Sequence, residues 1–123
     1  MSRGEEFFHG TTAHLKVGAV IAPGRKPNYA GESSPEHAYA TTSEEHGWDY
    51  AEKAWHASDK GHPRVYQVAP IGEVEKDPTE YETGSMAGRS RGNYDTDVRS
   101  RQGFKVLSER QMPEHMGTPE DWK

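Results

Sequence analysis

The chain has 123 residues, a formal net charge of −5 and no cysteine. This length fits one domain, because a single hydrophobic core is normally shared by about 100 to 150 residues. The missing cysteines exclude a disulfide framework, a thiolate nucleophile and a zinc site with sulfur ligands. No run approaches the about 20 apolar residues of a membrane span, and the acidic balance disfavours non-specific nucleic-acid binding. We expect one soluble, cytoplasmic, monomeric domain over residues 1–123, without membrane contact.

The apolar content of the chain is low. Leu, Ile, Val and Phe together make up about 11% of the residues, below the roughly 20% associated with disorder when net charge is high. Against disorder stand the modest net charge, an aromatic content of 10% and short apolar runs at strand-like intervals. The composition therefore favours a folded, loop-rich domain of modest stability, which a bound ligand would stabilise further.

The first half of the chain predicts short strands and one helix. Residues 6–9 form a strand candidate that runs into a polar turn, and residues 17–22 form a second short apolar run before a loop. Residues 38–41 form a brief strand candidate followed by Ser43 and two glutamates, a helix N-cap signal. Apolar residues then recur at helical spacing at positions 48, 51 and 55, so this helix should pack an apolar stripe into the core.

The second half predicts three further strands, over residues 64–69, 73–78 and 103–107, with a tight corner at 70–72. Residues 79–102 are rich in Gly, Ser, Arg and Asp and predict a long polar loop. Residues 110–123 should form a loosely held tail, in which Met112, Met116 and Trp122 could cover an edge of the core.

Polar residues end several of these predicted strands. They are His9, then Tyr39 with Thr41, then Asp77. Taken singly, each is more often a surface or turn residue than a functional one. Rigid strand ends can nevertheless hold side chains from distant parts of a chain around one cleft, so together they make a candidate site.

Six short motifs carry a resemblance to a known family. They are Phe7–Thr11, Leu15–Gly18, Ile21–Gly24 with Asn28 and Tyr29, His37–Thr41, Arg64–Val68 and Ile71–Pro78. In this order and spacing they resemble the rifamycin ADP-ribosyltransferase family, and a weaker match returns at residues 98–100 and 104–107. Each motif alone is unspecific, whereas six in sequence are not. The resemblance covers about three quarters of the chain.

The resemblance implies an α+β fold of the compact ADP-ribosyltransferase type. Two small antiparallel or mixed sheets would face each other around an NAD cleft, with one main helix. NAD would be the co-substrate, and a rifamycin-type antibiotic the small-molecule acceptor of ADP-ribose through a hydroxyl group.

The resemblance also implies roles for the candidate residues. His9, Tyr39 and Asp77 would form the catalytic set of the diphtheria-toxin-like branch, with His9 bonded to the ribose and Tyr39 stacked on nicotinamide. The cofactor-binding set would add Gly10, Thr11 and Thr41, with Gly10 leaving room for backbone contacts to the carboxamide. Asp77 would orient the acceptor and stabilise the positive charge that grows as nicotinamide leaves.

The chemistry of the implied reaction is consistent with this composition. Cleavage of the N-glycosidic bond produces an oxocarbenium-like sugar, so the enzyme needs an anion near the developing cation and a fixed leaving group. Neither a metal nor a cysteine is required. The seven histidines also show no His-Glu-x-x-His or His-x-His spacing, which disfavours a metal hydrolase.

The chain departs from the family pattern in two regions. Lys76 stands where the family has a second acid, and Val98 stands where it has a tyrosine. Residues 81–89 replace a proline- and glycine-containing run. Because these regions should contact the acceptor, NAD use is better supported than rifamycin use.

Two other functions stay open from the sequence. An arginine cluster at positions 89, 91, 99 and 101 could favour a toxin or effector that ADP-ribosylates RNA or protein. Alternatively, the chain could be a non-catalytic module that binds NAD or ADP-ribose.

Overall fold

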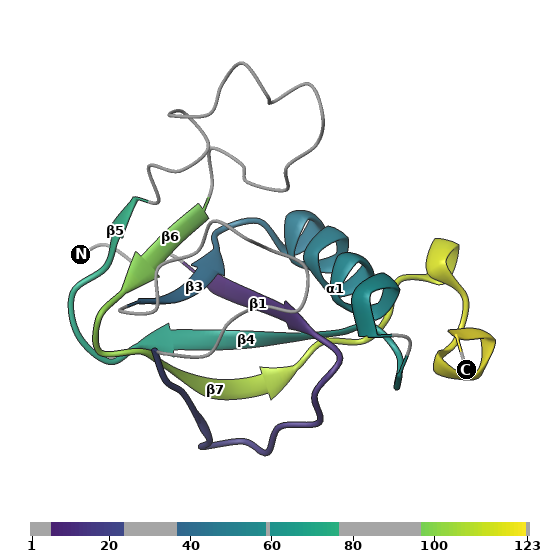
Figure 1. The fold of residues 1–123 in the computed structure, drawn as a ribbon, viewed down its shortest axis with the longest axis horizontal. Helices are drawn as coiled ribbons and strands as arrows, with labels where there is room; N and C mark the ends of the chain where they lie inside the picture. The colour runs from purple at the N-terminus through teal and green to yellow at the C-terminus, as the bar shows by residue number, and fades with distance from the viewer. Residues whose placement is uncertain (1–5, 24–36, 59, 77–96, 123) are drawn as a thin grey trace.

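The computed structural model describes residues 6–23, 37–58, 60–76 and 97–122. Within these residues the protein has seven strands, one α-helix and two short 3-10 helices (Figure 1). In chain order they are β1 (Phe7–Thr11), β2 (Val20–Ile21), β3 (Ala38–Thr41), α1 (Glu44–Ser58), β4 (Arg64–Pro70), β5 (Glu75–Lys76), β6 (Asp97–Ser100), β7 (Phe104–Glu109), η2 (Glu114–Met116) and η3 (Pro119–Trp122). The predicted α+β class is confirmed. Strands β2 and β5 are shorter than expected.

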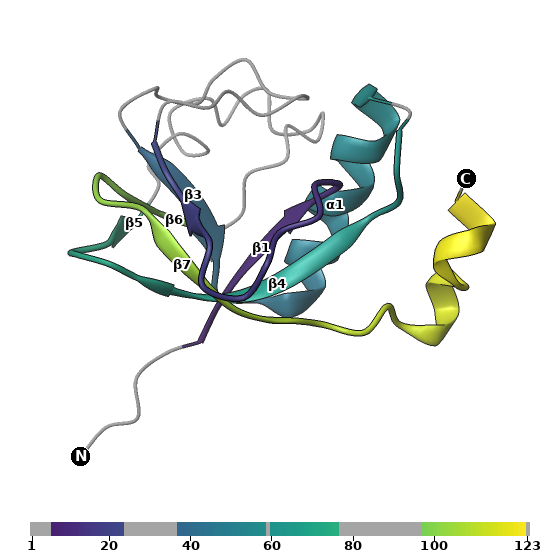
Figure 2. The same cartoon turned by 90° about the horizontal axis from the view of Figure 1, so that it is seen from below.

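The described strands form one antiparallel sheet in the order β2-β7-β4-β1-β3-β6-β5. The prediction of two separate small sheets is therefore wrong. Strand β1 pairs with β4 at five positions but with β3 through Phe8 and Thr41 alone. This pair keeps the sheet continuous, while β1 and β3 lean away from each other beyond it (Figure 2).

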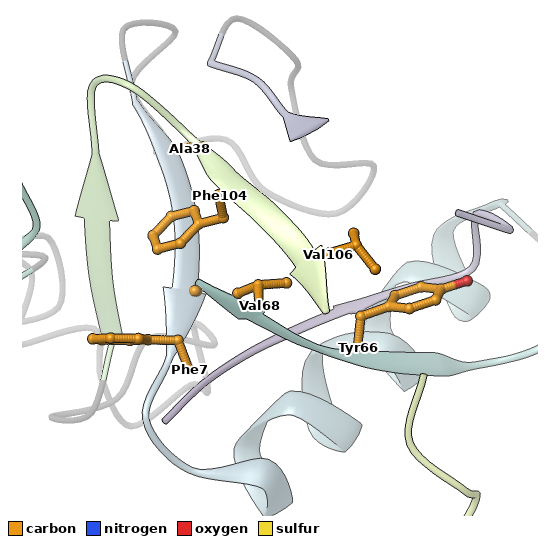
Figure 3. Packing of buried hydrophobic residues seen from close by; sticks show 7 residues of the cluster. Phe7, Ala38, Tyr66, Val68, Phe104 and Val106 are labelled. Atoms are coloured by element: carbon orange, nitrogen blue, oxygen red, sulfur yellow. The ribbon is translucent and has the colours of Figure 1, made fainter. Parts of the chain in front are cut away.

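One face of the sheet carries the larger apolar cluster, with Tyr66 and Phe104 fully buried (Figure 3). The buried hydroxyl of Tyr66 donates a hydrogen bond to the Ala13 carbonyl and accepts one from the Leu15 N–H, both at 2.9 Å. Because a buried hydroxyl is costly unless it is hydrogen-bonded, this pair of contacts stabilises Tyr66 in the core. It also fixes the segment that follows β1.

Helix α1 covers the opposite face at β1 and β4, where Phe8, Trp48, Ala51 and Val65 form a second cluster. The N-cap prediction is confirmed, because the Ser43 hydroxyl accepts a hydrogen bond from the His46 N–H at 3.2 Å. The predicted apolar stripe is correct at positions 48 and 51. At the next turn Ala54 is buried, whereas Trp55 is half-buried.

The helix lies unusually close to β1 at one point. A Cβ atom built on Gly10 would lie 2.0 Å from the Gly47 carbonyl oxygen and 2.8 Å from the Ala51 nitrogen. Both are backbone atoms, which cannot rotate away. Glycine is therefore required at position 10 for the helix to pack on the sheet.

The predicted loop over residues 79–102 is wrong at its end, where residues 97–100 form β6; residues 77–96 lie outside the described residues. The polar composition of residues 97–100 predicted a loop, whereas their polar side chains contact partners on neighbouring elements of the fold. Strand β6 pairs with β3 on one side and β5 on the other. The buried Asp97 carboxylate also accepts a hydrogen bond from the Tyr50 hydroxyl of α1.

The C-terminal segment packs against α1, as proposed for three of its residues. Met112 and Met116 contact the second cluster, the one between α1 and the sheet that contains Phe8 and Trp48. The Trp122 ring lies edge-on to the Trp55 ring, with 5.1 Å between the ring centroids. The Trp122 indole N–H also donates to the Met116 carbonyl at 2.9 Å. In the described part of the chain, no helix is long and apolar enough to cross a membrane.

Candidate active site

His9 and Tyr39 meet where the two halves of the sheet diverge. The Nδ1 atom of His9, on β1, lies 3.1 Å from the Tyr39 carbonyl oxygen on β3. A carbonyl oxygen only accepts hydrogen bonds, so Nδ1 carries a proton in this contact. The contact lies just beyond the Phe8–Thr41 pair that joins these strands. The structure therefore brings together two of the three predicted catalytic residues.

The side chains of β3 alternate between an apolar and a polar face. Ala38 and Ala40 contribute to the larger apolar cluster, so Tyr39 and Thr41 point the other way. Tyr39 lies directly opposite Arg99 on β6, and Arg99 lies directly opposite Glu75 on β5. Residues directly opposite each other share a face. Tyr39, Arg99 and Glu75 thus form a polar row across three strands.

Glu75 holds the polar row through an ion pair with Arg99 and a longer contact with His37. Its Oε2 atom lies 2.6 Å from Arg99 Nε and 3.5 Å from Nε2 of the buried His37. The His37 and Tyr39 rings lie 6.3 Å apart between centroids. We refer to His37, Tyr39, Glu75 and Arg99 as the polar quartet.

The charges of the quartet shift two pKa values. The hydrogen bond that Arg99 donates to Glu75, followed by the positive charge of Arg99, lowers the pKa of Glu75. Burial of the carboxylate raises this pKa, and the charges of His37 and Arg101 lower it further. Burial lowers the pKa of Arg99, but the hydrogen bond and charge of Glu75, followed by those of Tyr39, outweigh it and raise this pKa. Both groups are therefore held in their charged forms.

The lowered pKa of Glu75 makes the stability of the protein depend on pH. A carboxylate whose pKa is lower in the folded than in the unfolded chain stabilises the fold above the unfolded value, near 4.5, and loses this contribution as pH falls through the folded value. We expect acidification from pH 6 to pH 3 to lower Tm more in the parent protein than in Glu75→Gln. Circular dichroism melts at several pH values would measure the difference. It should be modest, because the carboxylate is exposed; equal pH slopes would contradict the assignment.

The residues predicted to join the cofactor-binding set have local structural roles. Gly10 faces α1, where its missing side chain is needed for packing. The Thr11 hydroxyl accepts a hydrogen bond from the Ala13 N–H at 3.1 Å, and the Thr41 hydroxyl accepts one from the Ser43 N–H at 3.3 Å. Thr41 is only 1% exposed. Contacts of these three residues with NAD stay predictions.

The third predicted catalytic residue, Asp77, lies outside the described residues. It directly follows β5, whose pairing with β6 fixes Lys76 opposite Val98. Of the arginine cluster, positions 89 and 91 also lie outside the described residues, and Arg99 is paired with Glu75. The described part of the cluster is thus partly neutralised.

Sequence reasoning missed His37 and Glu75 and noted Arg99 only as part of a basic cluster. The alternation of residues 37–41 contained a signal for one of them, since positions 37 and 39 of an extended segment share a face. No comparable local signal exists for Glu75. Its partners come from segments distant in the sequence.

The described residues hold no cluster of metal ligands, and a surface depression among them lies away from the candidate site. They contain no group of three or more histidine, aspartate or glutamate side chains that could hold a metal ion. A surface depression of about 450 Å³ is lined by residues 109–112 and 117–119. Its lining includes neither His9 nor any member of the polar quartet.

Comparison with known proteins identifies the family of the chain. A search of curated proteins finds no match. The family model described as rifampin ADP-ribosyl transferase (Arr-ms) matches residues 7–112. This range extends from β1 through β7 and contains His9, Tyr39 and the polar quartet. The chain therefore belongs to the rifampin ADP-ribosyl transferase family.

Proposed function

We propose that this protein is an NAD-dependent mono-ADP-ribosyltransferase that modifies a hydroxyl group of a rifamycin-type antibiotic. The observation that carries the proposal is the contact between His9 and Tyr39 at the divergence of the sheet. It lies in a chain that belongs to a family named for rifampin ADP-ribosyl transfer. Both residues are half-buried, as expected of side chains that line a binding site.

His9 would bind the ribose that carries nicotinamide. The Nδ1 contact with the Tyr39 carbonyl would orient the imidazole, and in the neutral ring with Nδ1 protonated Nε2 would accept a hydrogen bond from a ribose hydroxyl. A protonated ring would present a donor instead. The backbone of β3 thus helps to orient the His9 ring.

Tyr39 would stack on the nicotinamide ring through its aromatic face. Its side chain projects from the polar face of β3, opposite Arg99. An aromatic ring offers a large flat surface with few rotatable bonds, so stacking fixes the leaving group at low entropic cost.

Asp77 would supply the negative charge that the reaction requires. The bond between the ribose C1′ atom and the nicotinamide nitrogen breaks, and its electron pair leaves with nicotinamide. The acceptor hydroxyl oxygen forms the new bond to C1′ and loses its proton. A carboxylate beside the ribose stabilises the cation that develops between these events and orients the attacking hydroxyl.

Mass spectrometry of the purified protein with NAD, with and without rifampin, tests the proposal. We expect free nicotinamide and a rifampin product heavier by one ADP-ribose unit. Nicotinamide release without modified rifampin would contradict the antibiotic acceptor and direct the search to RNA and protein. Binding of NAD with no nicotinamide release in either sample would instead favour a non-catalytic binding module.

Salt dependence separates the two classes of acceptor. Binding to RNA releases counterions and should weaken steeply as salt is raised, whereas transfer to a small antibiotic should change little. We expect the rate of rifampin modification to be nearly constant between 50 and 200 mM salt, concentrations over which the affinity for a nucleic acid typically falls by orders of magnitude.

A further inference from the structure

The junction between the two halves of the sheet lies beside the candidate site (Figure 2). The first half consists of β2, β7, β4 and β1, and the second of β3, β6 and β5; they pair through Phe8 and Thr41. On one face, the larger apolar cluster includes Phe7 from the first half and Ala38 and Ala40 from the second. Apolar contacts are non-directional, so they hold the halves together without fixing the angle between them.

A hydrogen bond on the other face of the sheet connects the two halves. The hydroxyl of Tyr50, on α1, donates to the carboxylate of Asp97, the first residue of β6. Although α1 follows β3 in the chain, it packs on β1 and β4 and so belongs with the first half, whereas β6 belongs to the second. The Lys53 Nζ atom lies 5.6 Å from the centroid of the Tyr50 ring, a cation–π contact that helps to hold this ring in place.

The acceptor of this hydrogen bond lies in the same row as the junction. Asp97 is directly opposite Thr41, and Thr41 is directly opposite Phe8. Residues directly opposite each other share a face, so this row points toward α1, against which Phe8 packs. The next row on this face, two residues along β3 and β6, contains Tyr39 and Arg99. The hydrogen bond therefore acts one row away from Tyr39.

Burial makes this hydrogen bond effective. Asp97 is 4% exposed, and its neighbour Thr41 is 1% exposed. A hydrogen bond shielded from water is electrostatically stronger than the same bond at the surface. A buried carboxyl group also carries a desolvation penalty that an apolar side chain would avoid. Its presence at this junction is better explained by a need for a fixed angle than by stability alone.

We propose that Tyr50 and Asp97 are positioning residues: their hydrogen bond holds the second half of the sheet at a fixed angle to the first and thereby sets the separation of the His9 and Tyr39 side chains. His9 lies on the first half and Tyr39 on the second, and the contact between them spans the divergence. The role rests on the proposed function, in which these two residues bind the ribose and the nicotinamide of one NAD molecule. Tyr50 and Asp97 need not touch NAD themselves.

A distance measurement between the two halves tests the proposal without relying on activity. The chain has no cysteine, so two introduced cysteines can be spin-labelled selectively. Ala57 on α1 and Lys76 on β5 are exposed and lie on different halves, so Ala57→Cys and Lys76→Cys provide the labels. We expect pulsed electron paramagnetic resonance to give a narrow distance distribution, which broadens when Tyr50→Phe removes the hydroxyl but keeps the ring.

Kinetics of the unlabelled protein shows whether the angle between the halves affects NAD binding. We expect Tyr50→Phe to raise KM for NAD by about 5- to 10-fold, because a lost hydrogen bond lowers by roughly this factor the population in which both halves are in place. The change in kcat should be small, because saturating NAD restores that arrangement. Asp97→Asn keeps an oxygen that can accept from Tyr50, so it should raise KM by a smaller factor; if Tyr50→Phe does not fold, Asp97→Asn provides the same test.

Tyr66→Phe is the matched control. It also removes a hydrogen-bonded tyrosine hydroxyl, but the partners of that hydroxyl are Ala13 and Leu15, in the segment that follows β1 within the first half. We expect Tyr66→Phe to lower Tm and to leave the distance between the two labels unchanged. A general loss of stability would instead broaden the distance distribution in both tyrosine variants.

The outcomes separate this role from the proposed function. An unchanged distance distribution in Tyr50→Phe, or equal broadening in Tyr66→Phe, would overturn the positioning role. A broader distribution with an unchanged KM would overturn it as well, because the angle would then not affect NAD. A parent protein that neither binds nor cleaves NAD would overturn the proposed function and the positioning role with it, while the distances would still show whether the hydrogen bond fixes the angle.

Discussion

Asp77→Ala is expected to lower kcat for ADP-ribose transfer by about 10²- to 10³-fold, the usual cost of removing one electrostatic contact to a transition state. Affinity for NAD should change little, because the positive charge on the sugar develops only as nicotinamide leaves. Single-turnover release of nicotinamide would measure the chemical step, and titration calorimetry would measure NAD binding. The expected separation of the two is typical of a group that acts in the transition state.

The control for Asp77→Ala is Glu73→Ala, an exposed acid four residues earlier on the same segment. It removes an equal charge and should leave kcat unchanged. Asp77→Asn keeps the size of the side chain, so a loss equal to that of Asp77→Ala would attribute the effect to charge. Full transfer activity in Asp77→Ala would show that the catalytic assignment is wrong.

Much of the fold could be predicted because its signals are local. Ser43 followed by two glutamates indicates a helix start wherever the rest of the chain lies, and the alternation in residues 64–69 indicates a strand in the same way. The continuity of the sheet could not be predicted. It depends on the pair formed by Phe8 and Thr41, 33 positions apart in the sequence. Strand β6 was not predicted for a related reason. An arginine such as Arg99 is typical of a loop in the sequence, and its partner Glu75 lies 24 positions away in the chain.

The catalytic roles of His9, Tyr39 and Asp77 stay predictions, whereas the contacts around two of them are now described. His9 and Tyr39 were expected at strand ends, whereas they lie inside β1 and β3, and the pairing of these two strands brings them into contact. The polar quartet follows from the register of three strands, which one sequence does not determine. The glycine after His9 was explained by room for a ligand, whereas the structure gives it a packing role beside α1.

Gly10→Ala is expected to destabilise the fold by about 3 kcal/mol or more, the upper end of the range for an added methyl group in a packed core. The new Cβ would meet the Gly47 carbonyl oxygen at 2.0 Å, so α1 would have to move away from β1. Urea unfolding followed by circular dichroism would measure the loss.

Gly47→Ala is the matched control, because it adds the same methyl group from the other side of the same contact. The nearest atoms to its Cβ would be side-chain atoms of Val65, at 3.4 Å, and Phe8, at 3.5 Å, which are ordinary contact distances, and alanine favours a helix over glycine by about 1 kcal/mol. We therefore expect Gly47→Ala to be neutral or stabilising. Equal destabilisation by both variants would mean that the interface is merely crowded, whereas opposite effects would show that the closeness of α1 to β1 depends on position 10. Since position 10 follows His9 directly, a helix displaced by Gly10→Ala should also disturb the His9–Tyr39 contact and weaken NAD binding in whatever fraction stays folded.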